Sequence, residues 1–148
     1  MASWHVADCT FCDIRDGKIP AHVVDQDDDT VSFLDQRPLF PGHVLVIPRQ
    51  HHETLMELPT DLVAPLFLAV RRLSAAVKDA MQADGVFVAA NNLVSQSVPH
   101  LHVHVVPRRR GDGLRGFFWP RHRYASDAEA AEIAARIAAA VKMPTLTA

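Results

Sequence analysis

The chain has few of the features that mark secreted, fibrous or membrane proteins. Only two of its 148 residues are cysteine and six are glycine, so neither a disulfide framework nor a glycine-repeat structure is expected. Apolar runs fall well short of the about 20 residues that cross a bilayer. The opening sequence MASWHVADCTFC lacks the basic-then-apolar pattern of a signal peptide. We therefore expect a cytoplasmic protein with no membrane partner.

Charge is nearly balanced overall but uneven along the chain. The formal net charge is −2, which argues against general nucleic-acid binding. Residues 108–123 nevertheless hold six arginines and one aspartate. This stretch suits an anionic ligand such as a phosphate chain, and the alternative is a solvated arginine-rich loop.

Hydrophobic patterning predicts a single globular domain. Hydrophobic residues make up 49% of the chain, enough for one core in a domain of this length. Five short apolar segments bounded by turn residues predict strands. They cover residues 22–25, 31–35, 44–47, 86–90 and 100–106.

Two further segments have helical periodicity. Apolar residues recur every three or four positions from Leu62 to Met81, which predicts a long helix. Ser126 and Glu129 have the capping-box spacing and predict the start of a C-terminal helix. Its expected buried stripe consists of Ile133, Ile137 and Val141. The element order indicates an α+β fold, with a mainly antiparallel five-stranded sheet, a long helix and a C-terminal helix.

Three histidines alternate with apolar residues in PHLHVHVVPRRR, residues 99–110. On a strand, His100, His102 and His104 would share one face. They could ligate a metal with help from elsewhere, surround a central nucleophile, or form an accidental polar face. Cys9 and Cys12 form a C-x-x-C pair, which by itself is consistent with redox chemistry or half of a zinc site.

Three motifs together resemble the histidine triad (HIT) superfamily. QSVPHLHVHVVPR (residues 96–108) resembles its histidine signature. CTFCDIRDGKIPAHVV (9–24) and VSFLDQRPLFPGHVLVIPRQH (31–51) resemble its upstream segments. The resemblance covers about residues 9–108 of an expected single HIT domain, 1–148, whose C-terminal extension is 109–148. It implies the HIT-like fold, and relatives also lead us to expect a homodimer.

The resemblance implies a covalent mechanism at the α-phosphate of a nucleotide. His102, the middle histidine, would be the nucleophile and would form a nucleotidyl-histidine that water resolves. A neutral imidazole has a free nitrogen at pH 7, which suits this role. The implied catalytic set is His102, His104, His43, His100 and Ser97, with His104 and His43 at the phosphate oxygens and Ser97 near the leaving group.

The resemblance also implies a nucleotide pocket and a structural zinc ion. Asp35 would accept hydrogen bonds from ribose hydroxyls, and Asn91 and Gln96 would contact phosphates, although their loop is shorter than is common in the family. The base pocket would be lined by Phe11, Ile14 and Phe33. Zinc would be held by Cys9, Cys12, His51 and His100, with the adjacent His52 competing for the place of His51.

These expectations favour a HIT-family hydrolase or nucleotidyl transferase. Its substrates would be purine nucleotides, either dinucleoside polyphosphates or nucleoside phosphoramidates. One alternative is a zinc-dependent hydrolase that uses His100, His102 and His43 as catalytic ligands. Another is a nucleotide-sensing or interaction module with little turnover. In the tail, Trp119 or the arginines at 108–110 and 115 could contact the distal part of a substrate, or simply pack and solvate the surface.

Overall fold

The structure is a computed structural model that describes residues 6–115 and 121–141. The chain divides into two units, Met1–Asp112 and Gly113–Ala148. The first holds the sheet and most of the helices, and the second contains α3 (Asp127–Ala140). The tail residues Phe117, Phe118 and Trp119 lie outside the described residues.

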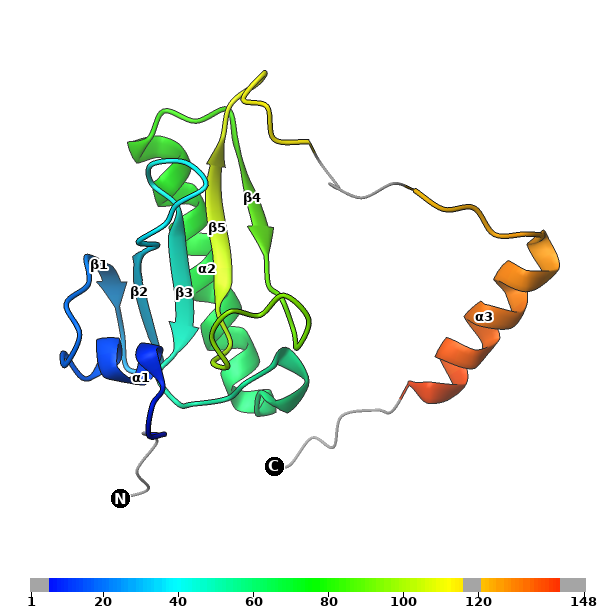
Figure 1. The fold of residues 1–148 in the computed structure, drawn as a ribbon, viewed down its shortest axis with the longest axis horizontal. Helices are drawn as coiled ribbons and strands as arrows, with labels where there is room; N and C mark the ends of the chain where they lie inside the picture. Colours follow the sequence, from blue (N-terminus) through cyan, green and yellow to red (C-terminus); the bar gives the residue numbers. More distant parts are fainter. Residues whose placement is uncertain (1–5, 116–120, 142–148) are drawn as a thin grey trace. The chain divides into compact units, whose positions relative to one another are not determined.

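The first unit is built on one five-stranded antiparallel sheet, as the hydrophobic pattern predicts. Its strands lie in the order β1-β2-β3-β5-β4, with every neighbouring pair antiparallel (Figure 1). The strands are β1 (Val23–Gln26), β2 (Thr30–Leu34), β3 (Val44–Pro48), β4 (Gly85–Ala89) and β5 (Val103–Arg108). β3 and β5 are therefore interior strands, and His43, His100 and His102 lie just before them while His104 lies within β5.

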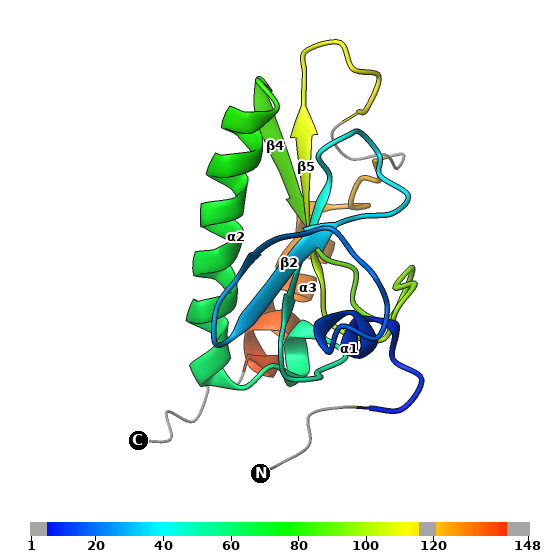
Figure 2. The ribbon, with the colours of Figure 1, turned by 90° about the vertical axis from the view of Figure 1, so that its left-hand side faces the viewer.

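Alternation along the central strands creates two apolar layers. Val44 and Val46 pack with Val103 and Val105 against α2 (Thr60–Ala80), which covers one face of the sheet. Leu45, between the two valines, belongs instead to a second cluster on the opposite face, together with α1 (Thr10–Arg15). Figure 2 shows α2 and α1 on opposite sides of the sheet.

Helix α1 and the 3-10 turn η1 (Leu55–Glu57) are absent from the sequence prediction. α1 has only six residues, too few for a clear periodic pattern, and its start depends on an unusual cap. The Sγ atom of Cys9 accepts a hydrogen bond from the backbone N–H of Cys12 at 3.4 Å. A metal-type motif therefore also begins this helix.

The predicted fifth strand begins too early. Residues 100–102 precede β5, because their backbone bonds are made elsewhere: His100 N–H donates to Val98 O, and Leu101 N–H donates to His52 O at 2.7 Å. The face assignment still holds for the apolar partners, since Leu101 lies in the α2-side cluster with Val103.

The predicted C-terminal helix forms. Ser126 caps α3 by accepting a hydrogen bond from Glu129 N–H at 3.1 Å. The other described residues of its own unit do not cover the expected apolar stripe, since Ile137 and Val141 are 62% and 68% exposed. Burial of this stripe stays a prediction. None of the helices formed by the described residues is long and apolar enough to span a membrane.

Candidate active site and metal centre

A cavity of about 410 Å³ opens beside the central strands. Its size is in the range of small-molecule sites, about 300–1,000 Å³. Apolar side chains form much of the wall, and His102, His104, Asp35 and Ser97 supply polar groups. The apolar lining includes Phe11, Ile14 and Phe33, which were predicted, and Ile19, Leu34, Leu45 and Val98, which were not.

The connection between β2 and β3 places Asp35 in the cavity wall and His43 within hydrogen-bond distance of His104, which lines the cavity. Asp35 N–H donates to His43 O at 2.9 Å, which closes this connection where the two strands end. Gly42 has φ +94°, and a Cβ there would lie 2.6 Å from Met81 Cγ. Glycine is therefore required for both conformation and space.

A chain of hydrogen bonds fixes the tautomers of His43 and His104. Leu39 N–H donates to His43 Nδ1 at 3.1 Å, so that nitrogen carries no proton. The neutral ring must then be protonated at Nε2, which donates to His104 Nδ1 at 2.9 Å. His104 in turn keeps its proton on Nε2. Burial, together with the neighbouring His102 and His43 rings, lowers the pKa of His104 to about 4, so the neutral form dominates.

His102 has the opposite arrangement of its two nitrogens. Its Nδ1 lies 2.7 Å from the carbonyl oxygen of His100. Because a carbonyl oxygen can only accept, Nδ1 carries the proton and Nε2 keeps its lone pair. The side chain is 2% exposed, and burial lowers its pKa from the ordinary 6.5. The buried ring is thus a neutral imidazole with one free nitrogen.

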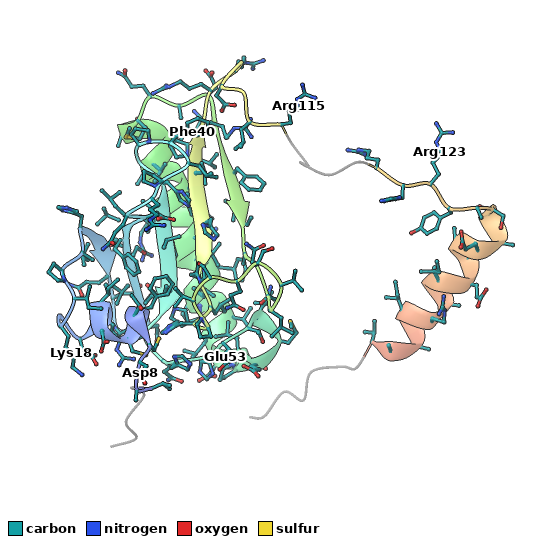
Figure 3. The ribbon with its side chains drawn as sticks, viewed as in Figure 1. Asp8, Lys18, Phe40, Glu53, Arg115 and Arg123 are labelled. Carbon is teal, nitrogen blue, oxygen red and sulfur yellow. The ribbon has the colours of Figure 1, made fainter. Side chains whose placement is uncertain are left out.

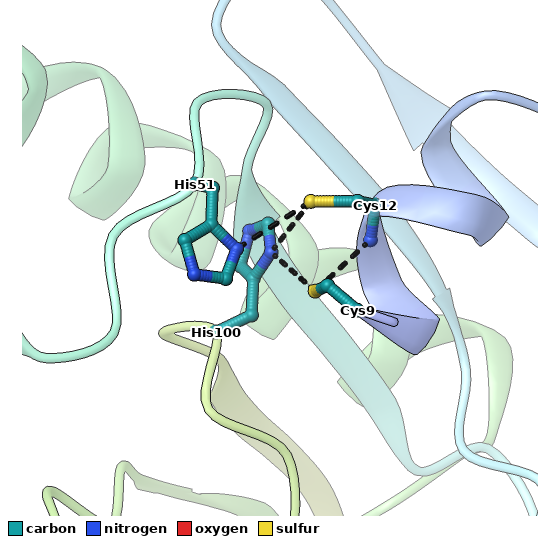
Figure 4. A group of neighbouring side chains, drawn as sticks. All are labelled: Cys9, Cys12, His51 and His100. Carbon is teal, nitrogen blue, oxygen red and sulfur yellow. Dashed lines mark hydrogen bonds between the residues drawn. The ribbon is translucent and has the colours of Figure 1, made fainter. Parts of the chain in front are cut away.

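Cys9, Cys12, His51 and His100 form a compact cluster beside this pocket (Figure 4). The Sγ atom of Cys9 lies 3.5 Å from His100 Nδ1, and Cys12 Sγ lies 3.4 Å from His51 Nδ1 and 3.7 Å from His100 Nδ1. Ligands of a tetrahedral zinc ion are separated by about 3.3–3.8 Å, as follows from Zn–S of about 2.3 Å and Zn–N of about 2.0–2.1 Å. The spacing therefore fits zinc.

The protonation states of the cluster also suit a metal. His100 Nε2 donates to the carbonyl of Pro48 at 2.9 Å, which leaves the Nδ1 lone pair facing the sulfur atoms. Burial lowers the pKa of His100 to about 4 and lowers that of His51. Burial raises the pKa of the Cys9 thiol, so without a cation it stays protonated. The four residues fit a structural Cys2His2 zinc site, and His52, the predicted competitor, lies outside the set.

Two of the predicted phosphate-binding residues make other contacts. The Asn91 side-chain amide donates to Ser95 O at 3.2 Å. The side chain of Gln96 donates to Glu53 O and accepts from Leu93 N–H at 2.9 Å. Neither lines the cavity, whereas Ser97 beside them does. Leu93 and Ser95 adopt positive φ, +71° and +61°, which is costly for residues other than glycine.

The cavity also contains polar groups that sequence reasoning missed: Thr10, Gln36 and Arg37. The backbone N–H of Arg37 donates to Asp35 Oδ1 at 2.8 Å, so this carboxylate is oriented by the residue two positions after it. The run Asp35-Gln36-Arg37 after a buried strand could have indicated this polar rim, because polar strand ends often line sites.

Two tail arginines have structural partners in the first unit. Arg108 Nε pairs with Asp112 at 2.6 Å, and the Arg109 guanidinium donates to Met81 O and Gln82 O, at the C-terminal end of α2. Arg109 also borders a small cavity with Phe40. This cavity is far from the cysteine cluster: Figure 3 shows Phe40 at one end of the sheet and Asp8, which precedes Cys9, at the other. A substrate role for Arg110 and Arg115 stays a prediction.

Fold and site together define an α+β domain with a histidine-lined pocket next to a cysteine–histidine cluster. A family model described as the HIT domain matches residues 16–111. The chain belongs to the HIT family.

Relatives and solved structures agree with this assignment. An uncharacterized HIT-like protein of Saccharolobus solfataricus is 43% identical over 101 residues, 67% of this chain and 73% of its own. An adenylylsulfatase of Arabidopsis thaliana is 35% identical (85% and 66% of the two chains), and an adenosine 5′-monophosphoramidase of Candida albicans is 32% identical (77% and 79%).

Among solved structures, a HIT-family protein of Bacillus subtilis has a TM-score of 0.84 at 34% identity, covering 92% of this chain and 99% of its own. A zinc-bound histidine triad protein of Mycobacterium smegmatis has a TM-score of 0.69 at 34% identity, covering 89% and 97%. The HIT fold is thus shared along most of the chain. Relatives also include nucleotide-processing enzymes.

Proposed function

We propose that the protein is a nucleotide hydrolase or nucleotidyl transferase that acts at the α-phosphate through covalent attachment to His102. The observation that carries this proposal is the arrangement of His102. Its Nδ1 is engaged with His100 O at 2.7 Å, and the ring, with its free Nε2, borders a cavity of about 410 Å³. A fixed neutral tautomer makes Nε2 available as a nucleophile.

The chemistry divides into two displacements. In the first, the Nε2 lone pair forms a bond to the α-phosphorus while the bond from phosphorus to the leaving group breaks. Ser97, at the cavity wall, donates the proton of its hydroxyl to that leaving group and recovers a proton from the water that attacks in the second displacement. In the second, water attacks the same phosphorus and the N–P bond breaks, which releases the mononucleotide. His104, whose Nε2 carries a proton, donates to phosphate oxygens as their charge grows, and His43 holds it in that tautomer.

The nucleoside half is proposed to bind in the apolar part of the cavity. Phe11, Ile14 and Phe33 contact a purine base, and Asp35 accepts from the ribose hydroxyls. The named activities of the Arabidopsis and Candida relatives concern adenylyl compounds with a sulfate or an amine as leaving group. They support an adenylyl compound such as a nucleoside phosphoramidate as the substrate here, and dinucleoside polyphosphates are the second proposed substrate class. Asn91 and Gln96 keep their proposed phosphate contacts only if their loop rearranges.

A catalytic zinc ion receives less support than the nucleophile. The alternative needs lone pairs of His100, His102 and His43 on one metal. His100 Nδ1 instead faces the two cysteines, and its Nε2 donates to Pro48 O, so His100 has no lone pair for a metal shared with His102. His43 Nε2 is also protonated, because Leu39 N–H occupies Nδ1. We propose that zinc, held by Cys9, Cys12, His51 and His100, is structural and takes no part in the chemical step.

We further propose a cytoplasmic homodimer. β4 is an edge strand of the sheet, and its Val88 is 41% exposed. On α2, Phe67 and Leu68 are 41% and 49% exposed. Apolar side chains at a sheet edge and on a helix favour association with a second copy. Light scattering at micromolar concentration tests this proposal, and a mass of 16.3 kDa would contradict it.

Trapping of the intermediate tests the proposed function directly. An adenosine phosphoramidate and a diadenosine polyphosphate are supplied, AMP release is followed, and acid-labile nucleotidyl-protein is sought by mass spectrometry after rapid quenching. We expect AMP release and a modified peptide that contains His102, with both lost in His102→Ala. Turnover with modification of no histidine would contradict the covalent route. Micromolar binding without turnover of any substrate would instead favour a nucleotide sensor.

A further inference from the structure

Phe11 connects the cysteine pair to His102. It lies between Cys9 and Cys12 in the sequence, and both cysteines are buried in the same cluster as its ring. The ring contacts the His102 imidazole edge to face, with centroids 5.0 Å apart and an interplanar angle of 83°. It also packs against Phe33, at 5.4 Å. The orientation of the Phe11 ring, and with it one wall of the His102 site, therefore depends on how the C-x-x-C turn is held.

His100 provides a second connection between the two sites. Its Nδ1 faces the sulfur atoms, and its Nε2 donates to Pro48 O. The same residue's carbonyl oxygen accepts from His102 Nδ1. The His100 side chain is fully buried and has both ring nitrogens engaged, so a metal bound at Nδ1 would fix the backbone that selects the tautomer of His102.

We propose that the zinc-binding segment is a positioning device for the nucleophile, with Phe11 and the His100 carbonyl as its two contacts on the His102 ring. Phe11 is accordingly a positioning residue in addition to a wall of the base pocket. Together the contacts hold the Nδ1–H tautomer with Nε2 directed at the pocket. This inference rests on the proposed function only for its kinetic consequences, because the ring geometry can be measured without a substrate.

The structural part is tested by long-range ¹H–¹⁵N spectra of the histidine rings, with the His102 signals assigned by their absence in His102→Gln. Zinc-loaded protein should show His102 as a single Nδ1–H tautomer. Folded protein freed of zinc, and zinc-loaded Phe11→Leu, should both show exchange between the two tautomers. An unchanged single tautomer in either sample would overturn the proposal. If zinc removal unfolds the chain, as backbone amide spectra would show, Phe11→Leu decides alone.

The kinetic part compares Phe11→Leu with Ile19→Ala, which shortens another apolar side chain of the pocket wall. Both variants should raise KM, because both thin the base pocket. Only Phe11→Leu should also lower kcat, by about three- to tenfold, the factor that an edge-to-face ring contact is worth. Equal kcat values in the two variants would contradict the positioning role. If no nucleotide is turned over, the spectra still decide the inference, so its failure and that of the proposed function remain distinguishable.

Discussion

Two clusters of potential metal-ligating side chains lie in the same unit, and their hydrogen bonds suit one to a metal ion and the other to a shared proton. Cys9, Cys12, His51 and His100 bring four ligand atoms within 4.8 Å of one another, and Asp35, His43 and His104 bring three within the same limit. Residue types alone would make both sets candidates for zinc. The outer hydrogen bonds distinguish them.

In the first cluster, the hydrogen bond on the far side of the His100 ring keeps the proton on Nε2, so Nδ1 is unprotonated. Pro48 O takes the N–H of His100 and leaves a lone pair facing the sulfurs. In the second, the outer partner is a donor: Leu39 N–H occupies His43 Nδ1, so the inner Nε2 is protonated. The first cluster is therefore suited to bind a cation, and the second shares a proton between His43 and His104. A backbone carbonyl bonded to one ring nitrogen leaves the other nitrogen free to bind a metal, whereas a backbone amide leaves the other nitrogen protonated.

The largest expected effect comes from removing the thiolates. The double variant Cys9→Ser, Cys12→Ser should lose zinc and become less stable, by about 4 kcal/mol where free zinc exceeds its Kd a thousandfold. Thermal unfolding with and without chelator, together with metal analysis, measures both. Wild-type protein with less than about a tenth of an equivalent of zinc would remove the distinction between the clusters, because a structural zinc site should be nearly fully occupied.

The next largest effect belongs to the second cluster. His104→Phe removes the proposed donor to phosphate and should lower kcat by about 10²–10³-fold, the usual cost of one such donor. Zinc content should stay at one equivalent, because His104 lies outside the cysteine cluster. Metal analysis of the variant is the matched control, and loss of zinc would show that the two clusters are not independent.

The sequence predicts the structure best where the hydrophobic pattern matches the side-chain packing. Alternation assigned Leu101 and Val103 to one side, and they lie in the α2-side cluster. The four zinc residues were chosen by resemblance, and they come together although His51 and His100 are far from the cysteines in sequence. Strong local periodicity also predicted all five strands and both long helices.

The rest depends on backbone groups that no residue identity shows. The predicted fifth strand begins too early because Leu101 N–H donates to His52 O and not to a neighbouring strand, and the sequence does not show this bond. Leu39 contributes to the site only through its N–H, so its side chain gives no signal. The sequence does not indicate α1, because its cap is a cysteine. It also does not show that Asn91 donates to Ser95 O or that Gln96 donates to Glu53 O, because both acceptors are backbone carbonyls.

Acid should affect the second cluster by a smaller margin. The pKa of His104 is about 4 in the folded protein and near 6.5 when the ring is exposed, so the unfolded chain binds the extra proton first. Its contribution to stability is complete above pH 6.5 and is lost as the pH falls toward 4. At pH 5.5, kcat/KM should remain within about twofold of its value at pH 7 as far as this group is concerned, against about tenfold for an unshifted histidine. A rate profile with an apparent pKa near 6.5 would contradict burial of the neutral pair.

The smallest effect is expected at the histidine next to a ligand. His52 Nε2 contacts Gln50 Oε1 at 3.3 Å, and its useful contact to Leu101 is made by the backbone carbonyl. His52→Ala keeps that carbonyl, so zinc should stay at one equivalent and unfolding free energy should change by less than about 1 kcal/mol. His51→Ala, the matched variant one residue earlier, removes a ring that lies 3.4 Å from Cys12 Sγ and should weaken zinc binding at least about tenfold. Competition with a zinc-selective dye measures both affinities. Equal losses of zinc affinity in the two variants would mean that either imidazole can ligate zinc. The backbone around residues 51 and 52 would then not determine which histidine is the ligand.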